Sequence, residues 1–115
     1  MDISIIIVNW NTRDLLCNCI ESVYNTVRDV SYEIIVVDNA SLDGSVSILQ
    51  KAYPQVKIIQ NEENRGFGAA NNQAMRIMKG EYALLLNSDT VLTENAVNEL
   101  FTFLETHQER SEEVV

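Results

Sequence analysis

The fold class is indicated by one stretch, Tyr82-Ala83-Leu84-Leu85-Leu86-Asn87-Ser88-Asp89-Thr90, in which an unbroken apolar run ends in polar residues. An apolar run without polar alternation is typical of a strand buried on both faces of a parallel sheet. A second run, Ile34-Ile35-Val36-Val37, ends in the same way at Asp38. Open parallel sheets bind ligands at the carboxyl ends of their strands. We therefore expect Asp38 and Asp89 to lie at one crevice.

Strand and helix patterns alternate along the rest of the chain. Strands are expected at about residues 3–9, 33–38, 56–60 and 82–86, and helices at about 12–27, 42–52, 68–78 and 94–106. Such alternation with short connections predicts parallel strands, right-handed crossovers and helices on both faces. The expected fold is therefore an α/β domain of four βα units around an open, mostly parallel, Rossmann-like sheet.

Local signals suggest where these helices begin and end. Ser41 and Thr93 are the expected N-caps of the second and fourth helices, and Gly80 is expected to end the third. The terminal pair Val114 and Val115 suggests entry into a fifth strand. We expect residues 1–115 to form one domain, as the front part of a longer polypeptide; the alternative is a complete small domain.

The composition argues against several functions. With 17 acids against 8 bases, the formal net charge is -9, which disfavours nucleic-acid binding and attraction to an anionic membrane. Cys17 and Cys19 are two residues apart in an expected helix, so they do not share a face for a disulfide or a zinc site. The apolar run at 3–8 is far shorter than the roughly 20 residues that span a bilayer. The chain is expected to be reduced and cytoplasmic.

Asp89 is the strongest candidate for chemistry, because a carboxylate at a strand end is suited to holding Mg²⁺ or Mn²⁺. Such hard cations take oxygen ligands, often one or two carboxylates together with the phosphates of a nucleotide. A bound cation would also offset the repulsion between an acidic protein and an anionic ligand. The alternative is that residues 87–90 form a polar turn.

Three further segments carry candidate binding residues. Asp38 would accept a hydrogen bond from a base or ribose group, or else form an Asx-type turn before the second helix. Trp10, between Asn9 and Asn11, would cover a nucleobase or else pack in the core. Arg65 precedes glycines at 66 and 68, which allow close backbone approach or only serve the turn. As a cation beside a helix N-terminus, Arg65 suggests an anion site.

Other nucleotide and catalytic folds do not match. The segment after the first strand, Asn9-Trp10-Asn11-Thr12, lacks both the glycine pattern of a dinucleotide fold and the acidic pair of a receiver domain. The chain has no Gly-Lys-Ser/Thr phosphate loop. Its single histidine, His107, is expected to be exposed near the end of the fourth helix. A catalytic triad or a zinc site therefore cannot be assembled.

Taken together, these segments resemble the family-2 glycosyltransferases of the GT-A fold, and most closely the bacterial rhamnosyltransferase-like members. The resemblance implies a nucleotide-binding half with Asn9, Trp10 and Asn11 lining the base pocket. The matching segments are Ser4-Ile5-Ile6-Ile7-Val8-Asn9-Trp10-Asn11, Ile35-Val36-Val37-Asp38-Asn39-Ala40-Ser41-Leu42-Asp43-Gly44-Ser45, Asn64-Arg65-Gly66-Phe67-Gly68-Ala69-Ala70-Asn71-Asn72, Gly80-Glu81-Tyr82 and Leu85-Leu86-Asn87-Ser88-Asp89-Thr90.

The remaining roles are also implied by the resemblance. Asp38 would contact the base or ribose, and Arg65 would lie near the nucleotide. Asn87 and Ser88 stand in the family's Asp-x-Asp motif, with Asp89 as the ligand of Mg²⁺ or Mn²⁺. Asn87 replaces the first aspartate of that motif, so it brings an amide that can bond a ribose hydroxyl but no charge.

The implied activity is inverting transfer of a sugar from a UDP- or dTDP-linked donor to a polysaccharide or glycolipid acceptor. In the full-length enzyme this would occur in the cytoplasm, at the inner face of the membrane. The family's catalytic base lies in a second half for which no match follows Asp89. The alternative is a non-catalytic module, a truncated or degenerate relative that binds nucleotide or forms a homo-oligomer through an open sheet edge.

Overall fold

The computed structural model describes residues 1–107 and 112–114. Within them, five parallel strands form one sheet in the order β3-β2-β1-β4-β5. The strands are β1 (Ile3–Asn9), β2 (Tyr32–Asn39), β3 (Lys57–Asn61), β4 (Tyr82–Asn87) and β5 (Glu112–Val114), and the helices are α1 (Arg13–Thr26), α2 (Ser45–Ala52), α3 (Phe67–Ile77) and α4 (Ala96–Thr106). The predicted α/β fold with four βα units is confirmed. A fifth strand also follows, and Val115 lies outside the described residues.

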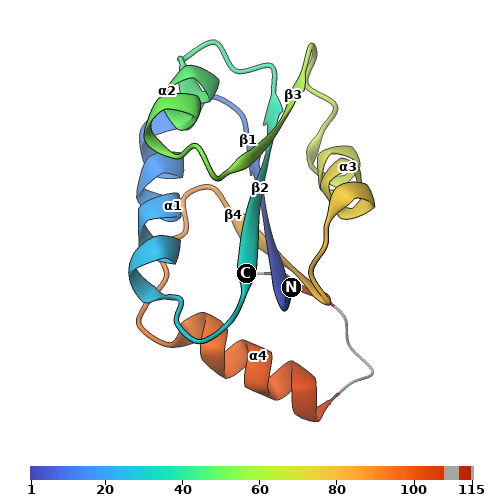
Figure 1. Cartoon of the computed structure of the whole chain (residues 1–115). Coiled ribbons are helices and arrows are strands. Elements are labelled where there is room, and N and C mark those ends of the chain that lie inside the picture. The colour runs from blue at the N-terminus through green and yellow to red at the C-terminus, as the bar shows by residue number, and fades with distance from the viewer. Residues whose placement is uncertain (108–111, 115) are drawn as a thin grey trace.

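The helices cover both faces of the sheet. Figure 1 shows α1 and α2 on one face, α3 on the other, and α4 across the lower end. Alternate side chains of β1 point to opposite faces, so Ile5 and Ile7 pack with α1, while Ile6 packs against Ala70 and Ala74 of α3. The interior residues of β1, β2 and β4 are buried on one face or the other, apart from the partly buried Val8, so these apolar runs lack polar alternation, whereas β3 is only partly buried.

The predicted apolar stripes of α1 and α4 are largely buried. On α1 they include Leu16, Ile20, Val23 and Val27, none more than 5% exposed. On α4, Val97 and Leu104 are buried, and Leu100 and Phe101 are partly buried against the same cluster. This agreement follows from the 3.6-residue period of a helix that packs one face on a sheet.

The strand order creates a switch point at β1. From β1 the chain moves outward to β2 and β3, and then returns through α3 to β4 on the other side of β1. The crossovers on the two sides of β1 therefore run over opposite faces of the sheet. At such a point the loops that follow neighbouring strands lead to opposite faces of the sheet. Open α/β sheets bind ligands in the crevice between such loops. The residues that follow Asn9 and Asn87 flank this crevice.

The two predicted N-caps are wrong. Helix α2 begins at Ser45 after Gly44, whose φ of 81° is left-handed, so Ser41 lies in the preceding loop. Helix α4 begins at Ala96 after Asn95, whose φ is 68°, rather than after Thr93. In each case a left-handed residue sets the start of the helix, and no side chain at the cap position bonds the first turn.

Gly80 does not end α3 as predicted. The helix stops at Ile77, and Met78 is already extended. Gly80 instead packs on the backbone of β1, where a Cβ would lie 2.4 Å from Ser4 N. Its N–H donates to Ser4 Oγ at 2.8 Å. A glycine is required here because β1 approaches too closely for any side chain.

A polar cluster fixes this amino end of the sheet. Glu33 of β2 accepts hydrogen bonds from Ser4 Oγ at 2.6 Å, Lys57 Nζ at 2.7 Å and Lys79 N at 2.6 Å. Burial alone would raise the pKa of Glu33, but these donors outweigh it and hold the pKa below its ordinary value. The cluster ties β1, β2 and β3 to the turn before β4.

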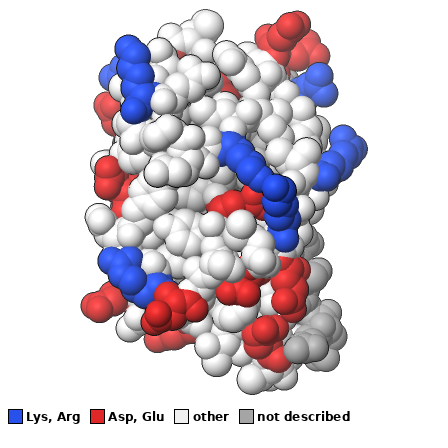
Figure 2. Space-filling model, in the orientation of Figure 1, with Lys and Arg blue, Asp and Glu red and all other residues white. Residues whose placement is uncertain are grey.

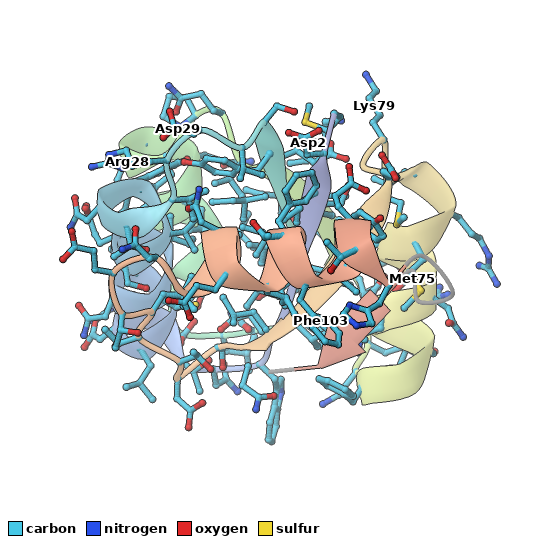
Figure 3. All side chains as sticks on the ribbon, turned by 90° about the horizontal axis from the view of Figure 1, so that it is seen from below. Asp2, Arg28, Asp29, Met75, Lys79 and Phe103 are labelled. Atoms are coloured by element: carbon cyan, nitrogen blue, oxygen red, sulfur yellow. The ribbon has the colours of Figure 1, made fainter. Side chains whose placement is uncertain are left out.

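The amino end is also covered by α4, whereas the carboxyl end is formed by loops. Figure 3 looks onto the amino end, where α4 crosses in front of the strands, with Arg28, Asp29, Asp2 and Lys79 on one side of it and Phe103 on the other. Acidic side chains gather at this lower end in Figure 2, and basic ones are scattered singly. An anionic ligand at the carboxyl end would therefore not meet the acids of α4.

The described part of the sheet ends at β3 and β5, which have five and three residues. β3 begins with Lys57, whose ammonium is held by Glu33. Short strands and an edge lysine are features that disfavour strand addition. Self-association through a sheet edge stays a prediction. Across residues 1–107 and 112–114 we find no helix with the length and apolar character to cross a bilayer.

Replacing Gly80 by alanine is expected to destabilise the protein. The new methyl group would overlap the β1 backbone, and forced overpacking of this kind costs about 1–3 kcal/mol. The free energy of unfolding, measured with urea, should fall by that amount.

The matched control is Gly68→Ala. A Cβ at Gly68 of α3 meets nothing within 4 Å. Alanine is favoured over glycine inside a helix, so this variant should be as stable as the parent or up to about 1 kcal/mol more stable. Equal stability of the Gly80→Ala protein and the parent would contradict the close-approach argument.

Candidate functional site

A chain of hydrogen bonds joins the three loops at the carboxyl ends of β2, β1 and β4. Asn9 Nδ2 donates to Asp38 Oδ1 at 2.8 Å and lies 3.2 Å from Ser41 Oγ. Asn9 Oδ1 accepts from Thr12 Oγ1 at 2.6 Å, and Thr12 Oγ1 lies 3.0 Å from Ser88 Oγ. The loops that carry Asp38 and Asp89 therefore converge, as the strand pairing requires.

The strand register explains why these groups meet. Asn9 of β1 pairs with Asp38 of β2, and Val8 pairs with Asn87 of β4. Carboxyl ends in register place successive polar residues side by side at one edge of the sheet. Neither Thr12 nor Ser41 was predicted to contribute to the site, since each makes its contacts with residues far away in the sequence.

Asp38 is buried, with only 1% of its surface exposed. Its Oδ1 accepts from Asn9, and its Oδ2 accepts from the backbone N–H of Ser41 at 3.0 Å. This geometry matches the alternative of a turn held by the carboxylate, although α2 starts four residues after Ser41. Direct contact of Asp38 with a nucleoside stays a prediction, and it would require the loop to expose the carboxylate.

The other predicted residues of the first loop divide into buried and exposed groups. Asn9 is fully buried and its amide is fully engaged. Trp10 is 57% exposed, so the alternative of a core tryptophan is wrong. Asn11 has a φ of 54° and accepts from Leu42 N at 2.7 Å, which ties the β1 and β2 loops together again. The indole of Trp10 is thereby held on a fixed loop above the sheet.

Asp89 is exposed at the end of the β4 turn, beside the exposed Asn87 and the half-buried Ser88. Within the part of the chain that the structure describes, its carboxylate makes no hydrogen bond or ion pair. Cys19 of α1 lies below this turn, with its Sγ 3.7 Å from Asn87 O. Burial, and then the negative charge of Asp89, raise the pKa of the Cys19 thiol to about 12. Cys19 is therefore a neutral thiol at ordinary pH.

The donor set is suited to a hard divalent cation that also binds phosphate. Asp89 supplies one carboxylate, and Ser88 and Asn87 supply neutral oxygens near it. Residues 1–107 and 112–114 hold no group of three or more His, Cys, Asp or Glu side chains that would form a protein-only metal cage. One carboxylate together with the phosphates of a ligand is a common arrangement for Mg²⁺, so the residues fit a metal that arrives with a nucleotide.

Arg65 lies on the third loop, between β3 and α3, and its side chain is exposed. Its guanidinium makes no ion pair or hydrogen bond with the described residues, while its backbone N–H is 3.4 Å from Asn39 Oδ1. Two adjoining depressions, of about 560 and 500 Å³, lie beside this loop. They share Gln60, Asn61 and Glu62, and the larger is also lined by Arg65.

Asp43 is a site residue that the sequence did not reveal. It caps two helices at once: Oδ2 accepts from Arg13 N, the first residue of α1, at 2.9 Å, and Oδ1 accepts from Ser45 N, the first residue of α2, at 3.0 Å. Burial would raise the pKa of Asp43, but the hydrogen bonds from Ser45 and Arg13 outweigh it and hold the pKa below its ordinary value. The two-residue spacing from Asp43 to Ser45 is typical of the local contact with α2. It gives no indication of the contact with Arg13 of α1.

A parallel sheet whose loops bring amide, hydroxyl and carboxylate groups to its switch point defines an α/β domain of the Rossmann-like GT-A class. The chain belongs to glycosyl transferase family 2, whose profile matches residues 4–111. The predicted family is therefore confirmed, while closeness to the rhamnosyltransferase-like members stays a prediction.

Characterised relatives support this assignment. The chain is 39% identical over 113 residues to a poly(ribitol-phosphate) beta-glucosyltransferase of Bacillus spizizenii, covering 94% of this chain and 18% of that protein. It is 36% identical over 99 residues to a chondroitin synthase of Escherichia coli, covering 83% of this chain and 14% of that protein. The chain therefore spans less than a fifth of the length of either relative.

Solved structures show the same architecture. Residues 1–349 of S. aureus TarS in complex with UDP-GlcNAc align with a TM-score of 0.82 at 25% identity, covering 94% of this chain and 32% of that chain. A mannosyltransferase from Pyrobaculum calidifontis aligns with a TM-score of 0.80 at 23% identity, covering 89% of this chain and 32% of that chain. The second likeness concerns the fold alone.

Asp43→Ala is expected to destabilise the protein by about 1–3 kcal/mol, because two helix starts lose their cap together. The control is Glu94→Ala, which removes an exposed acid that makes no hydrogen bond or ion pair with the described residues. Urea unfolding at pH 7 measures both. Equal losses in the two variants would contradict the double-cap role.

The effect of Asp43 should also depend on pH. Its folded pKa lies below the ordinary value of 3.8, so the ionised carboxylate stabilises the protein above that pH. The stability difference between the parent and Asp43→Asn should therefore be constant near neutrality and shrink as the pH falls below about 4. A difference that grew on acidification would have the wrong sign.

Proposed function

We propose that this chain is the nucleotide-sugar-binding half of an inverting glycosyltransferase. Its donor would be a UDP- or dTDP-linked sugar held together with Mg²⁺ or Mn²⁺, and its acceptor a polysaccharide or glycolipid. The reaction would take place in the cytoplasm, at the inner face of the membrane. The chain covers a small part of each relative, so the remaining machinery would belong to the full-length enzyme.

The observation that carries this proposal is the hydrogen-bonded chain from Ser41 through Asn9 and Thr12 to Ser88. It joins the loops at the carboxyl ends of β2, β1 and β4; in this proposal the β2 loop would meet the nucleoside and the β4 turn the diphosphate. Trp10, Asn87 and Asp89 are exposed on the β1 and β4 loops, and Arg65 is exposed on the β3–α3 loop. A nucleoside diphosphate presents an aromatic base, ribose hydroxyls and two phosphates, which match an indole, an amide, a metal-bound carboxylate and a guanidinium.

Named relatives support the donor class. The TarS structure contains UDP-GlcNAc, and the Bacillus spizizenii relative is a beta-glucosyltransferase acting on poly(ribitol-phosphate). A uridine nucleotide and a cell-wall or capsular polymer are therefore the substrates to test first. In this proposal Trp10 covers the base, and Asn9 and Asn11 hold the loop that carries it.

The phosphate side of the site would be built from the β4 turn and the β3–α3 loop. Asn87 and Ser88 would bond the ribose or a phosphate, Asp89 would bind the metal, and Arg65 would lie near the nucleotide. When bound, the cation would supply positive charge to the leaving diphosphate. Asp38 would contact the base or ribose if the loop opens, and in the closed loop it orients Asn9.

The proposed transfer forms one bond, breaks one bond and moves one proton. The acceptor hydroxyl oxygen forms a bond to the anomeric carbon, the bond from that carbon to the diphosphate breaks, and the hydroxyl proton passes to a carboxylate base. We assign no residue to that base, because the acids of α4 lie at the amino end of the sheet, away from the crevice. Nucleotide binding without turnover is therefore the alternative for the isolated chain.

Calorimetric titration with UDP and dTDP, each with and without Mn²⁺, tests the proposal. The parent chain is expected to bind more tightly with the metal. Asp89→Asn should lower the metal-dependent affinity roughly tenfold or more, because the metal loses its carboxylate but the turn keeps its shape.

The matched control is Glu94→Gln, which neutralises an exposed acid five residues further along the same connection. It should bind as the parent does. Metal-independent binding, or equal affinities for the parent and Asp89→Asn, would contradict the proposal.

A further inference from the structure

Three amides connect β2, β3 and α3 behind the Arg65 loop. Asn61 and Gln73 form a reciprocal pair, in which Asn61 Nδ2 donates to Gln73 Oε1 and Gln73 Nε2 donates to Asn61 Oδ1, each at 2.8 Å. Asn61 Nδ2 also donates to Asn39 Oδ1 at 2.9 Å. Asn39 and Asn61 are 2% and 6% exposed. Buried amides of this kind are costly unless every group finds a partner, so the arrangement is strongly specified.

Asn39 uses its remaining hydrogen-bonding capacity on the Arg65 loop. Its Oδ1 is 3.4 Å from Arg65 N, and its Nδ2 donates to Gly66 O at 3.3 Å. One side chain therefore holds the backbone of two successive residues, one through an N–H and the other through a carbonyl. A side-chain amide accepts through its oxygen and donates through its nitrogen at the same time, which a carboxylate of the same shape cannot do.

The same backbone is fixed from two further directions. Asn64 Oδ1 accepts from Gly66 N at 2.8 Å, and Gly66 O accepts from Ala70 N at 3.3 Å in the first turn of α3. Gly66 has a φ of 83°, which glycine adopts without strain. The start of α3 and the backbone of Arg65 are thus held by one small region.

We infer that Asn39, Asn61 and Gln73 are positioning residues that hold the backbone of Arg65 in place for contact with the donor nucleotide. This inference rests on the proposed function. The Arg65 side chain is exposed and has no side-chain partner among the described residues, so the network fixes the backbone from which the guanidinium extends and not the direction of the guanidinium itself. A loop that is already held in place loses less conformational freedom when a ligand binds.

A double-mutant cycle with UDP and Mn²⁺ tests this role. Arg65→Ala is expected to weaken binding roughly tenfold. Gln73→Met, which keeps the size of the side chain but breaks the amide pair, should weaken binding about threefold to tenfold when Arg65 is present. In the Arg65→Ala background the same change should have less than about a twofold effect.

The possible results distinguish a failure of the proposed function from a failure of the positioning role. Failure of the parent chain to bind any nucleotide would overturn the proposed function and this inference with it. Binding by the parent with equal losses from Gln73→Met in both backgrounds would mean a purely structural network, and would overturn the inference alone. No effect of Arg65→Ala would do the same.

Two further variants guard against a folding artefact. Gln50→Met is the control, because Gln50 is an exposed glutamine on α2, distant from the amide network; it should bind as the parent does. Asn39→Asp is the second probe if Gln73→Met does not fold. It keeps the acceptor oxygen Oδ1 but replaces the donating amide nitrogen, so it cannot donate to Gly66 O, and it should show the same coupling to Arg65→Ala. Absence of that coupling in a folded Asn39→Asp protein overturns the inference.

Discussion

The hydrogen bonds of the Asn9 side chain are the interaction on which the carboxyl end of this molecule depends. Asn9 is fully buried at the end of the central strand, and it donates to the Asp38 carboxylate of the next strand at 2.8 Å. It also accepts from Thr12, whose hydroxyl reaches Ser88 beyond β4. Because β1 lies between β2 and β4, an amide at its end can bind the β2 loop directly and reach the β4 turn through Thr12. These contacts hold the three loops together at the switch point.

Polar clusters at the two ends of the sheet share a structural role. Apolar side chains fill the middle, and an apolar core of Ile, Val and Leu tolerates shifts that polar contacts do not. At the amino end, Glu33 binds Ser4, Lys57 and the Lys79 backbone. At the carboxyl end, the amide and carboxylate of Asn9 and Asp38 are paired directly across the strands. A register shift of one residue would leave buried charges and amides unpaired at both ends, which is a large penalty.

The sequence predicted the features that follow from the periodicity of apolar residues. It did not predict contacts between residues that are far apart in the sequence. The apolar runs predicted four strands, and the spacing of Leu16, Ile20 and Val23 predicted the buried face of α1. The cap at Ser41 was wrong because its hydroxyl bonds Asn9 and Asn11, thirty or so positions away. For the same reason the sequence did not show that Asp43 caps α1. Gly80 follows a helix, yet glycine is needed there because the backbone of β1 passes too close for a side chain. Local pattern therefore predicted that the loops carrying Asp38 and Asp89 would converge, but not the hydrogen bonds that join them.

Burial divides the candidate site residues and their neighbour Asn39 into two groups. Asn9, Asp38 and Asn39 are at most 2% exposed, and their polar atoms are engaged with other loops. Trp10, Arg65, Asn87 and Asp89 are exposed, and their side chains make no hydrogen bond or ion pair with residues 1–107 or 112–114. Fixing the loops before a ligand arrives removes part of the ordering entropy that binding would otherwise cost. Affinity for nucleotide would then depend on the exposed residues for contacts and on the buried residues for the geometry of those contacts. Loss of a buried amide should therefore weaken binding only when the exposed side chain on the loop that it holds is present.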